Sequence, residues 1–232
     1  MRRRDLTVRA TPRPWPGLAL AVLILASATL GRAESATAPR AVVSLGAGSE
    51  LWLEGTSTVH DYESRTSTLG FTLMRDPSQA DPADAAALDA WLRAGGLRGL
   101  DLVVPLKTMR SGKAGLDKNM LKALRAGEFP EIRFLLSASQ LGVARGDTLP
   151  VSADGSLKVA GHQRAIAVKG QLVRGDKGVW LEGSHAMLMS DYGVKPPTMM
   201  LGTLRVRDPI VVHYRLLLVP GEAGGTKAVS NH

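Results

Sequence analysis

Apolar and polar residues alternate with a period of two through much of the second half of the chain. Between residues 131 and 139, one face carries Ile132, Phe134, Leu136 and Ala138. Successive side chains of a β-strand point to opposite faces, so this alternation predicts a strand with one apolar face. Similar patterns predict strands at 49–62, 67–75, 98–106, 155–160, 164–173, 179–189, 203–207 and 210–219. Asp154-Gly155 and residues 175–178 are typical of hairpin turns.

Two stretches have helical spacing instead. Residues 82–95 are rich in alanine, begin with acidic residues and end at two glycines. Residues 116–126 place leucines and Met120 at helical intervals, and Gly127 and Pro130 follow. Many short strands with one or two short helices predict a mainly β fold, and the pattern alone leaves a closed barrel and a sandwich open.

Several predicted strands are apolar on both faces, as at residues 134–136 (Phe-Leu-Leu) and 216–218 (Leu-Leu-Leu). A strand with one face in water would alternate more strictly. One interpretation is a barrel that is partly covered outside and is lined inside for an apolar guest.

The first 33 residues have the parts of a secretory signal. Arginines occupy positions 2–4, residues 18–26 are apolar, and Gly31 and Ala33 offer small side chains at the two positions that determine cleavage. We expect a signal peptide over 1–33 and a periplasmic mature protein, with an uncleaved membrane anchor as the alternative.

The rest of the chain divides by composition into a linker, one domain and a tail. Residues 34–48 and 220–232 are rich in small residues, which predicts a linker and a flexible tail around one folded domain at 49–219. The formal charge of +8 falls to +3 when residues 1–33 are removed, which gives little reason to expect a nucleic-acid partner. The absence of cysteine excludes disulfides and thiolate chemistry.

Three segments resemble the YceI-like family. They are 51–62, with an aromatic residue and Ser57-Thr58-Val59; 103–134, which ends in Phe129-Pro130-Glu131-Ile132-Arg133-Phe134; and 155–168, which begins with Gly155-Ser156-Leu157. The resemblance covers about residues 50–219, with residues 76–96 as an insertion. It implies a single antiparallel, lipocalin-like, eight-stranded β-barrel that holds a polyisoprenoid or quinone-like chain.

The resemblance and the alternation together predict which side chains line the barrel. The expected ligand-binding residues are Phe71, Leu73, Val104, Met120, Leu124, Phe134, Val168, Met187 and Met189. The methionines near 187–189 and 199–200 suit a flexible apolar guest, although an ordinary core would also hold them. The loop at 190–197 is either a rim of this pocket or a simple connector.

Other chemistry finds little support in the sequence. His60 and Asp61 are adjacent in a predicted strand and would point to opposite faces, so they form a poor acid–base pair. The five histidines lack metal-ligand spacing, and a site built from His60, His185 and His213 is the weaker alternative to ordinary polar positions. We expect no metal and no cofactor.

Three classes of function therefore stay open. The favoured hypothesis is an exported, non-catalytic carrier of an isoprenoid or other long-chain lipid. The second is a hydrolase or isomerase that acts on a lipid-like substrate with His60 or His213 as base. The third is a structural partner whose interior is merely core. Lys113, Lys118 and Lys122 could meet anionic lipid in a transient membrane contact, although a solvated helix face is the commoner explanation.

Overall fold

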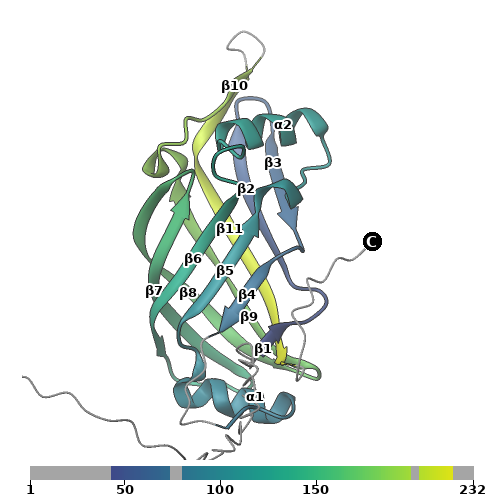
Figure 1. The fold of residues 1–232 in the computed structure, drawn as a ribbon, viewed down its shortest axis with the longest axis vertical. Helices are drawn as coiled ribbons and strands as arrows, with labels where there is room; N and C mark the ends of the chain where they lie inside the picture. Colours follow the sequence, from purple (N-terminus) through teal and green to yellow (C-terminus); the bar gives the residue numbers. More distant parts are fainter. Residues whose placement is uncertain (1–42, 74–79, 200–203, 222–232) are drawn as a thin grey trace, which may run out of the picture. The chain divides into compact units, whose positions relative to one another are not determined.

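The computed structural model describes residues 43–73, 80–199 and 204–221. Its strands are β1 (Val43–Leu45), β2 (Glu50–Ser57), β3 (Asp61–Thr66), β4 (Gly70–Leu73), β5 (Leu100–Pro105), β6 (Glu131–Leu141), β7 (Thr148–Val159), β8 (His162–Gly175), β9 (Gly178–Leu188), β10 (Thr198–Met199) and β11 (Leu204–Pro220). All pair antiparallel in the order β3-β2-β11-β9-β8-β7-β6-β5-β4, while β1 and β10 pair with β11. The sheet is strongly curled (Figure 1).

Two helices lie near opposite ends of this curled sheet (Figure 1). The first, α1 (Ala85–Trp91), continues into a π-helical turn, η1 (Leu92–Gly96), and the second is α2 (Ala114–Ala123). Two short 3₁₀ turns, η2 (Leu106–Thr108) and η3 (Met189–Tyr192), complete the helical elements of the described residues. This agrees with both helices that the sequence predicts.

Helix α1 closes one end of the sheet. Leu88 and Leu92 are fully buried, and Trp91 is nearly so, in a cluster that includes core residues of β7, β8 and β11. Asp89 on the same helix is 2% exposed and accepts hydrogen bonds from Arg93 and from Arg174 of β8. The end of the barrel next to α1 is therefore packed as an ordinary core.

Helix α2 is attached differently, because none of its residues is fully buried. Its start is tied to the preceding loop, where the Ser111 hydroxyl and backbone N–H donate to one carboxylate oxygen of Asp117 at 2.6 and 2.8 Å. The apolar side chains Met120 and Leu121 of α2 pack against a small buried cluster of Val104, Leu106, Met109 and Ala126.

The wall of the barrel has a seam between its two edge strands. β3 and β4 are consecutive in the chain but lie at opposite ends of the strand order, and no ladder joins them within the described ranges. Arg65 of β3 and Arg110 exchange two backbone hydrogen bonds of 2.8 and 2.9 Å beside this seam. Beside the seam, β3 is therefore paired with residue 110 by a single β-bridge and not by a continuous ladder.

Strands β8 and β9 are paired along only part of their length. Their ladder runs from the turn at Gly175 and Gly178 as far as Lys169 opposite Ser184, and ends there. Beyond that point β8 stays paired with β7 and β9 with β11, so the two strands diverge. Arg164 of β8 donates to the backbone oxygen of Asp191 in η3 at 2.9 Å, which ties η3 across this fork.

Several predicted boundaries differ from the structure. The predicted strand 49–62 is a hairpin of β2 and β3, with a turn in which the Ser57 hydroxyl donates to the His60 carbonyl at 2.7 Å. The predicted strands 203–207 and 210–219 form the single long strand β11, whose register with β2 shifts between Val206 and Ile210. The sheet path therefore has nine strands in the described residues rather than eight.

The prediction of a turn at Asp154-Gly155 is wrong. Both residues lie inside β7, and the actual turn between β7 and β8 is at Ala160-Gly161, where both φ angles are positive. Gly155 is required by close packing, since a side-chain carbon there would lie 2.6 Å from the Phe134 ring and 2.5 Å from the Leu135 carbonyl oxygen. A glycine inside a strand often marks a place where a neighbouring group approaches the backbone closely.

An irregularity in the same part of the β6–β7 ladder explains why the Ala138 side chain does not lie on the same face of β6 as Leu136. The register between β6 and β7 shifts between Leu136 and Ala138, so the extra residue reverses the alternation that follows. Ala138 is exposed, whereas Ser139 and Leu141 are partly buried. A β-bulge of this kind leaves no clear mark in the pattern of apolar residues.

The predicted linker 34–48 contains part of the fold. Val43 in β1 is fully buried in the main core cluster, and β1 pairs with the last residues of β11 up to Pro220. The folded domain therefore begins before residue 49. The predicted signal peptide and most of the predicted tail lie outside the described residues, and no helix in the described part of the chain is long and apolar enough to cross a membrane.

Candidate functional site

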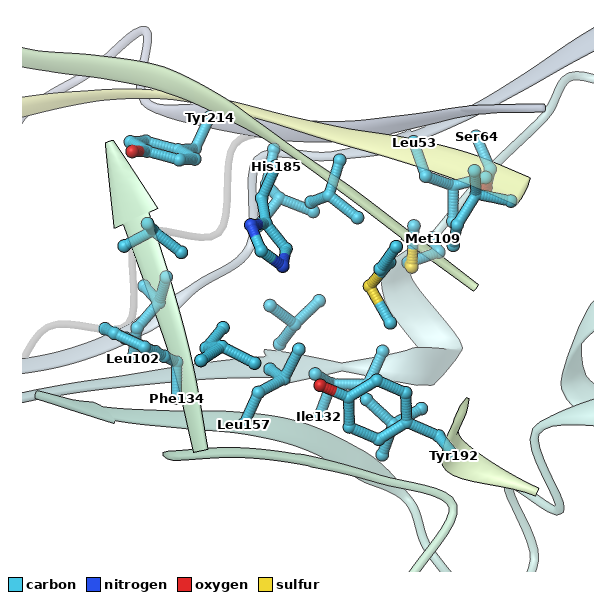
Figure 2. A pocket seen from close by; sticks show the side chains of 18 of the residues that line it. Leu53, Ser64, Leu102, Met109, Ile132, Phe134, Leu157, His185, Tyr192 and Tyr214 are labelled. Carbon is cyan, nitrogen blue, oxygen red and sulfur yellow. The ribbon is translucent and has the colours of Figure 1, made fainter. Parts of the chain in front are cut away.

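The curled sheet encloses a cavity with a solvent-accessible volume of about 220 Å³. Strands on every side of the wall contribute to it, as do α2, η3 and the loop after η3 (Figure 2). Its aliphatic lining includes Leu51, Leu53, Leu97, Leu100, Leu102, Val104, Leu136, Val151, Leu157, Val159, Ile166, Leu181, Val206, Ile210, Val212 and Leu216. Among the described lining residues there is no Asp, Glu, Lys or Arg.

Strand alternation produces this lining. On β9 the inward side chains are Leu181, His185 and Met187, with Gly183 at the inward position between the first two and Met189 just beyond the strand. On β11, Val212 and Tyr214 face inward, and His213 between them lies on the outer face. The interior is apolar because the sequence places aliphatic residues at every second position of several strands.

Seven of the nine residues predicted to bind a ligand line the cavity: Val104, Met120, Leu124, Phe134, Val168, Met187 and Met189. The structure thereby brings together residues of β5, α2, β6, β8 and β9. Phe71 and Leu73 on β4 are not in the lining and belong to the core cluster next to α1, where Leu73 is 3% exposed. They lie at the filled end of the barrel, which strand parity alone does not distinguish from the hollow part.

The methionines and the loop at 190–197 also have defined places. Met109 is 1% exposed and lines the cavity together with Met120. Met200 lies outside the described residues, and only the backbone of Met199 is described. In the loop, Tyr192, Val194 and Pro197 border the cavity, whereas Lys195 is exposed.

Five polar side chains of the lining were absent from the predicted set: Tyr62, Ser64, His185, Tyr192 and Tyr214. Alternation on β9 places His185 on the same face as Met187 and would have identified it. Tyr62 and Ser64 were hidden because the hairpin of β2 and β3 was not predicted.

Tyr214 lies over a pair of glycines on neighbouring strands. Gly170 and Gly183 are opposite each other in the β8–β9 ladder, and a side-chain carbon at Gly170 would lie 2.8 Å from the Tyr214 hydroxyl. That hydroxyl donates to the Lys169 carbonyl at 3.1 Å. Burial raises the pKa of Tyr214 to about 12, so the phenol stays protonated.

Two polar side chains of β3, Ser64 and Tyr62, border the cavity. The hydroxyl of Ser64, which is 2% exposed, makes no hydrogen bond within the described residues. Burial raises the pKa of Tyr62, whose side chain also borders a groove at the seam formed with residues 110–113 and Leu116. An unpaired buried polar group costs about 1–3 kcal/mol of stability, so the Ser64 hydroxyl remains a cost when the guest offers it no hydrogen bond.

His185 projects into the middle of the cavity (Figure 2). Its imidazole makes no hydrogen bond to any residue that the structure describes. Burial lowers the pKa of His185 below its ordinary value of 6.5, because the charged form is disfavoured in an apolar setting. The ring is therefore neutral at pH 7 and offers one donor and one acceptor.

The remaining histidines do not assemble a catalytic or metal site. His60 lies in the turn between β2 and β3, and His213 stacks on Trp52 on the outer face with ring centroids 5.0 Å apart. No group of three or more metal-ligating side chains occurs in the described ranges. The suggested set of His60, His185 and His213 is thus divided between a turn, the interior and the exterior.

Comparison with known proteins places this fold and cavity in a family. The model of the YceI-like domain matches residues 53–216, which is well over half of the chain. The chain belongs to the YceI-like family. The mainly β, antiparallel, lipocalin-like fold that the sequence predicts is thereby confirmed, although none of the curated proteins matches this chain.

Two solved structures share the fold of this YceI-like chain at low sequence identity. BcnA of Burkholderia cenocepacia is 14% identical, with a TM-score of 0.56 over 76% of this chain and 99% of that one. A polyisoprenoid binding domain from Saccharophagus degradans, implicated in plant cell wall breakdown, is 13% identical, with a TM-score of 0.57 over 78% of this chain and 99% of that one.

Proposed function

We propose that this YceI-like protein binds one long apolar lipid with an isoprenoid chain inside its barrel and carries it without changing it. The observation that carries the proposal is the cavity, whose described lining is almost wholly aliphatic and holds no charged side chain. Burial of each CH₂ group of a guest contributes about 0.8 kcal/mol, so a chain of several isoprene units needs no ionic anchor.

The S. degradans neighbour supports the choice of ligand, since that protein is described as a polyisoprenoid binding domain. The fold alone does not carry a ligand from one protein to another at this identity. The support comes from the joint occurrence of the fold and an apolar interior.

A carrier is favoured over a hydrolase or isomerase by the arrangement of polar groups. A general base needs an acid or a carbonyl that orients it, and His185 has no such partner in the described part of the cavity. His60 and His213 lie outside the cavity, so they cannot reach a guest within it.

We also propose that the chain is exported to the periplasm. Three features support a cleaved signal peptide: the basic start, the apolar stretch at 18–26, and the small residues Gly31 and Ala33. N-terminal sequencing of the protein from its native host should then begin within a few residues of Glu34, and an intact Met1 would contradict this.

Lipid extraction tests the carrier function. Protein purified from its native host should release one intact isoprenoid lipid in nearly stoichiometric amount, measured by mass spectrometry of the organic extract and by native mass measurement. Met187→Glu places a charge against the apolar lining and should abolish the bound lipid. Lys177→Glu, in the exposed turn between β8 and β9, should leave it unchanged.

The outcomes separate the three classes of function. Mixed products or turnover of added lipid would favour an enzyme. A parent protein that never contains or takes up lipid would leave a structural role, and the carrier proposal would fail.

A further inference from the structure

His185 occupies the middle of the cavity along β9. It lies four residues from Leu181 and four from Met189, both of which also border the cavity. At the rise of a β-strand, each of these lies about 13 Å along the chain from His185. A group that interacts with His185 therefore lies along the middle of the β9 lining, between Leu181 and Met189.

The position also coincides with the fork in the wall. The β8–β9 ladder ends at Ser184, so His185 is the first residue of β9 that has left β8. Its cross-strand partner is Val212 of β11, which gives the imidazole no polar contact. The ring therefore faces the cavity, where aliphatic and methionine side chains surround it (Figure 2).

Neighbouring polar groups do not satisfy this imidazole. The Tyr214 hydroxyl is already engaged with the Lys169 carbonyl, and His185 itself has no hydrogen bond among the described residues. A bound water needs two to four polar partners, which this part of the lining does not supply. An oxygen atom of the guest is the remaining partner.

The chemistry of the lining restricts what that oxygen belongs to. A neutral imidazole pairs well with a carbonyl or a hydroxyl, as donor to the first and as donor or acceptor to the second. A phosphate carries charge that an apolar interior without arginine or lysine cannot compensate.

We infer that His185 is a specificity-determining residue that hydrogen-bonds an uncharged oxygen of the lipid. This rests on the proposed function. The expected ligand class is an isoprenoid lipid that ends in a quinone carbonyl or an alcohol, and isoprenoid phosphates are disfavoured.

Calorimetric titration of delipidated protein with three probes tests the inference. The probes are a short-tailed isoprenoid benzoquinone, the hydrocarbon squalene, and farnesyl phosphate. His185→Leu should weaken binding of the benzoquinone by about fivefold to tenfold, as expected for one hydrogen bond, and leave squalene unchanged or bound more tightly. Farnesyl phosphate should bind the parent more weakly than the benzoquinone.

His213→Leu is the matched control, because it makes the same substitution on the adjacent strand but on the outer face. It should leave the affinity for all three probes within about twofold of the parent. Equal losses for benzoquinone and squalene in His185→Leu, or no loss for either, would overturn the inference while leaving the carrier function intact. A parent that binds none of the probes would overturn the carrier function as well.

A measurement on the parent protein covers the case in which His185→Leu does not fold. The imidazole ¹⁵N resonances of His185 should shift on addition of the benzoquinone and stay in place with squalene. Identical responses to both probes would show that the head group does not reach His185.

Discussion

At the scale of single residues, His185 makes the protein sensitive to mild acid. Burial lowers its pKa below 6.5, and the other titratable side chains that face the cavity are Tyr62, Tyr192 and Tyr214, none of which titrates near neutrality. As the pH falls through 6.5, the unfolded chain takes up a proton at this position that the folded chain resists. Stability and lipid retention should therefore decrease as the pH is lowered from about 6.5.

Urea unfolding and lipid retention between pH 7 and pH 5 measure this effect. His185→Leu should flatten both profiles relative to the parent, since the other histidines are present in both proteins. An unchanged slope in the variant would show that another group is responsible.

Gly183 illustrates how one missing side chain shapes the pocket. A carbon added there would lie 2.7 Å from the Lys169 carbonyl oxygen and would also collide with the Tyr214 hydroxyl. Gly183→Ala should destabilise the fold by about 1–3 kcal/mol in urea unfolding, because the backbone cannot move away easily. Gly127→Ala is the control, since a carbon there meets nothing within 4 Å, and a similar loss for both variants would contradict the packing argument.

At the scale of elements, helix α1 is held across the end of the barrel by a buried carboxylate. Asp89 is 2% exposed, and although burial raises its pKa, hydrogen bonds from Arg93 and Arg174 more than offset this and leave the pKa lowered. Asp89→Ala should cost about 2–3 kcal/mol of stability in urea unfolding, because two guanidinium groups lose their partner at a packed helix.

The exposed pair of Arg125 and Glu128 provides the comparison. Their side chains are 48% and 63% exposed, so Glu128→Ala should cost far less stability than Asp89→Ala. If both carboxylates contributed equally, α1 would not be anchored by Asp89. Because its pKa is lowered, the contribution of Asp89 is present above its ordinary value of 3.8 and is lost as the pH falls below it.

At the scale of the whole molecule, the cavity links stability to occupancy. The core cluster that includes residues of α1 and two smaller buried clusters pack around the cavity. A guest that binds only the folded state stabilises it by about 2.7 kcal/mol at a hundredfold excess over Kd. Delipidated protein should therefore melt several degrees below the loaded protein in calorimetry, and reloading with the lipid extracted from the native protein should restore the Tm.

The Tm is also measured with squalene and with a water-soluble isoprenoid fragment that lacks a long chain. The short fragment should raise the Tm far less, because buried apolar area sets the gain. Equal Tm values with and without lipid would mean that the cavity stays empty in solution.

The sequence alone was sufficient where structure is local. Period-two alternation on 179–189 placed Met187 and Met189 inward, and glycines at 175 and 178 marked a true hairpin. Helical spacing at 116–126 found α2, and its apolar side supplies Met120 and Leu124 to the cavity. These features depend on neighbours along the chain, which a single sequence contains.

Only the tertiary structure decided the features that depend on distant contacts. Gly155 is a strand residue because of Phe134 and Leu135, which lie on another strand, and the bulge after Leu136 reverses the faces that follow. Leu73 belongs to a filled core because α1 packs at that end of the barrel.

For the polar residues of the site, too, the sequence determined one part and the tertiary structure decided the other. The sequence determined that His185 shares a face with Met187, because strand geometry fixes which side chains point together. That this face surrounds an empty space, with no partner for His185 in its described part, follows from how nine strands close around one another. Alternation specifies the face of a strand, whereas the volume enclosed by those faces is a property of the whole barrel.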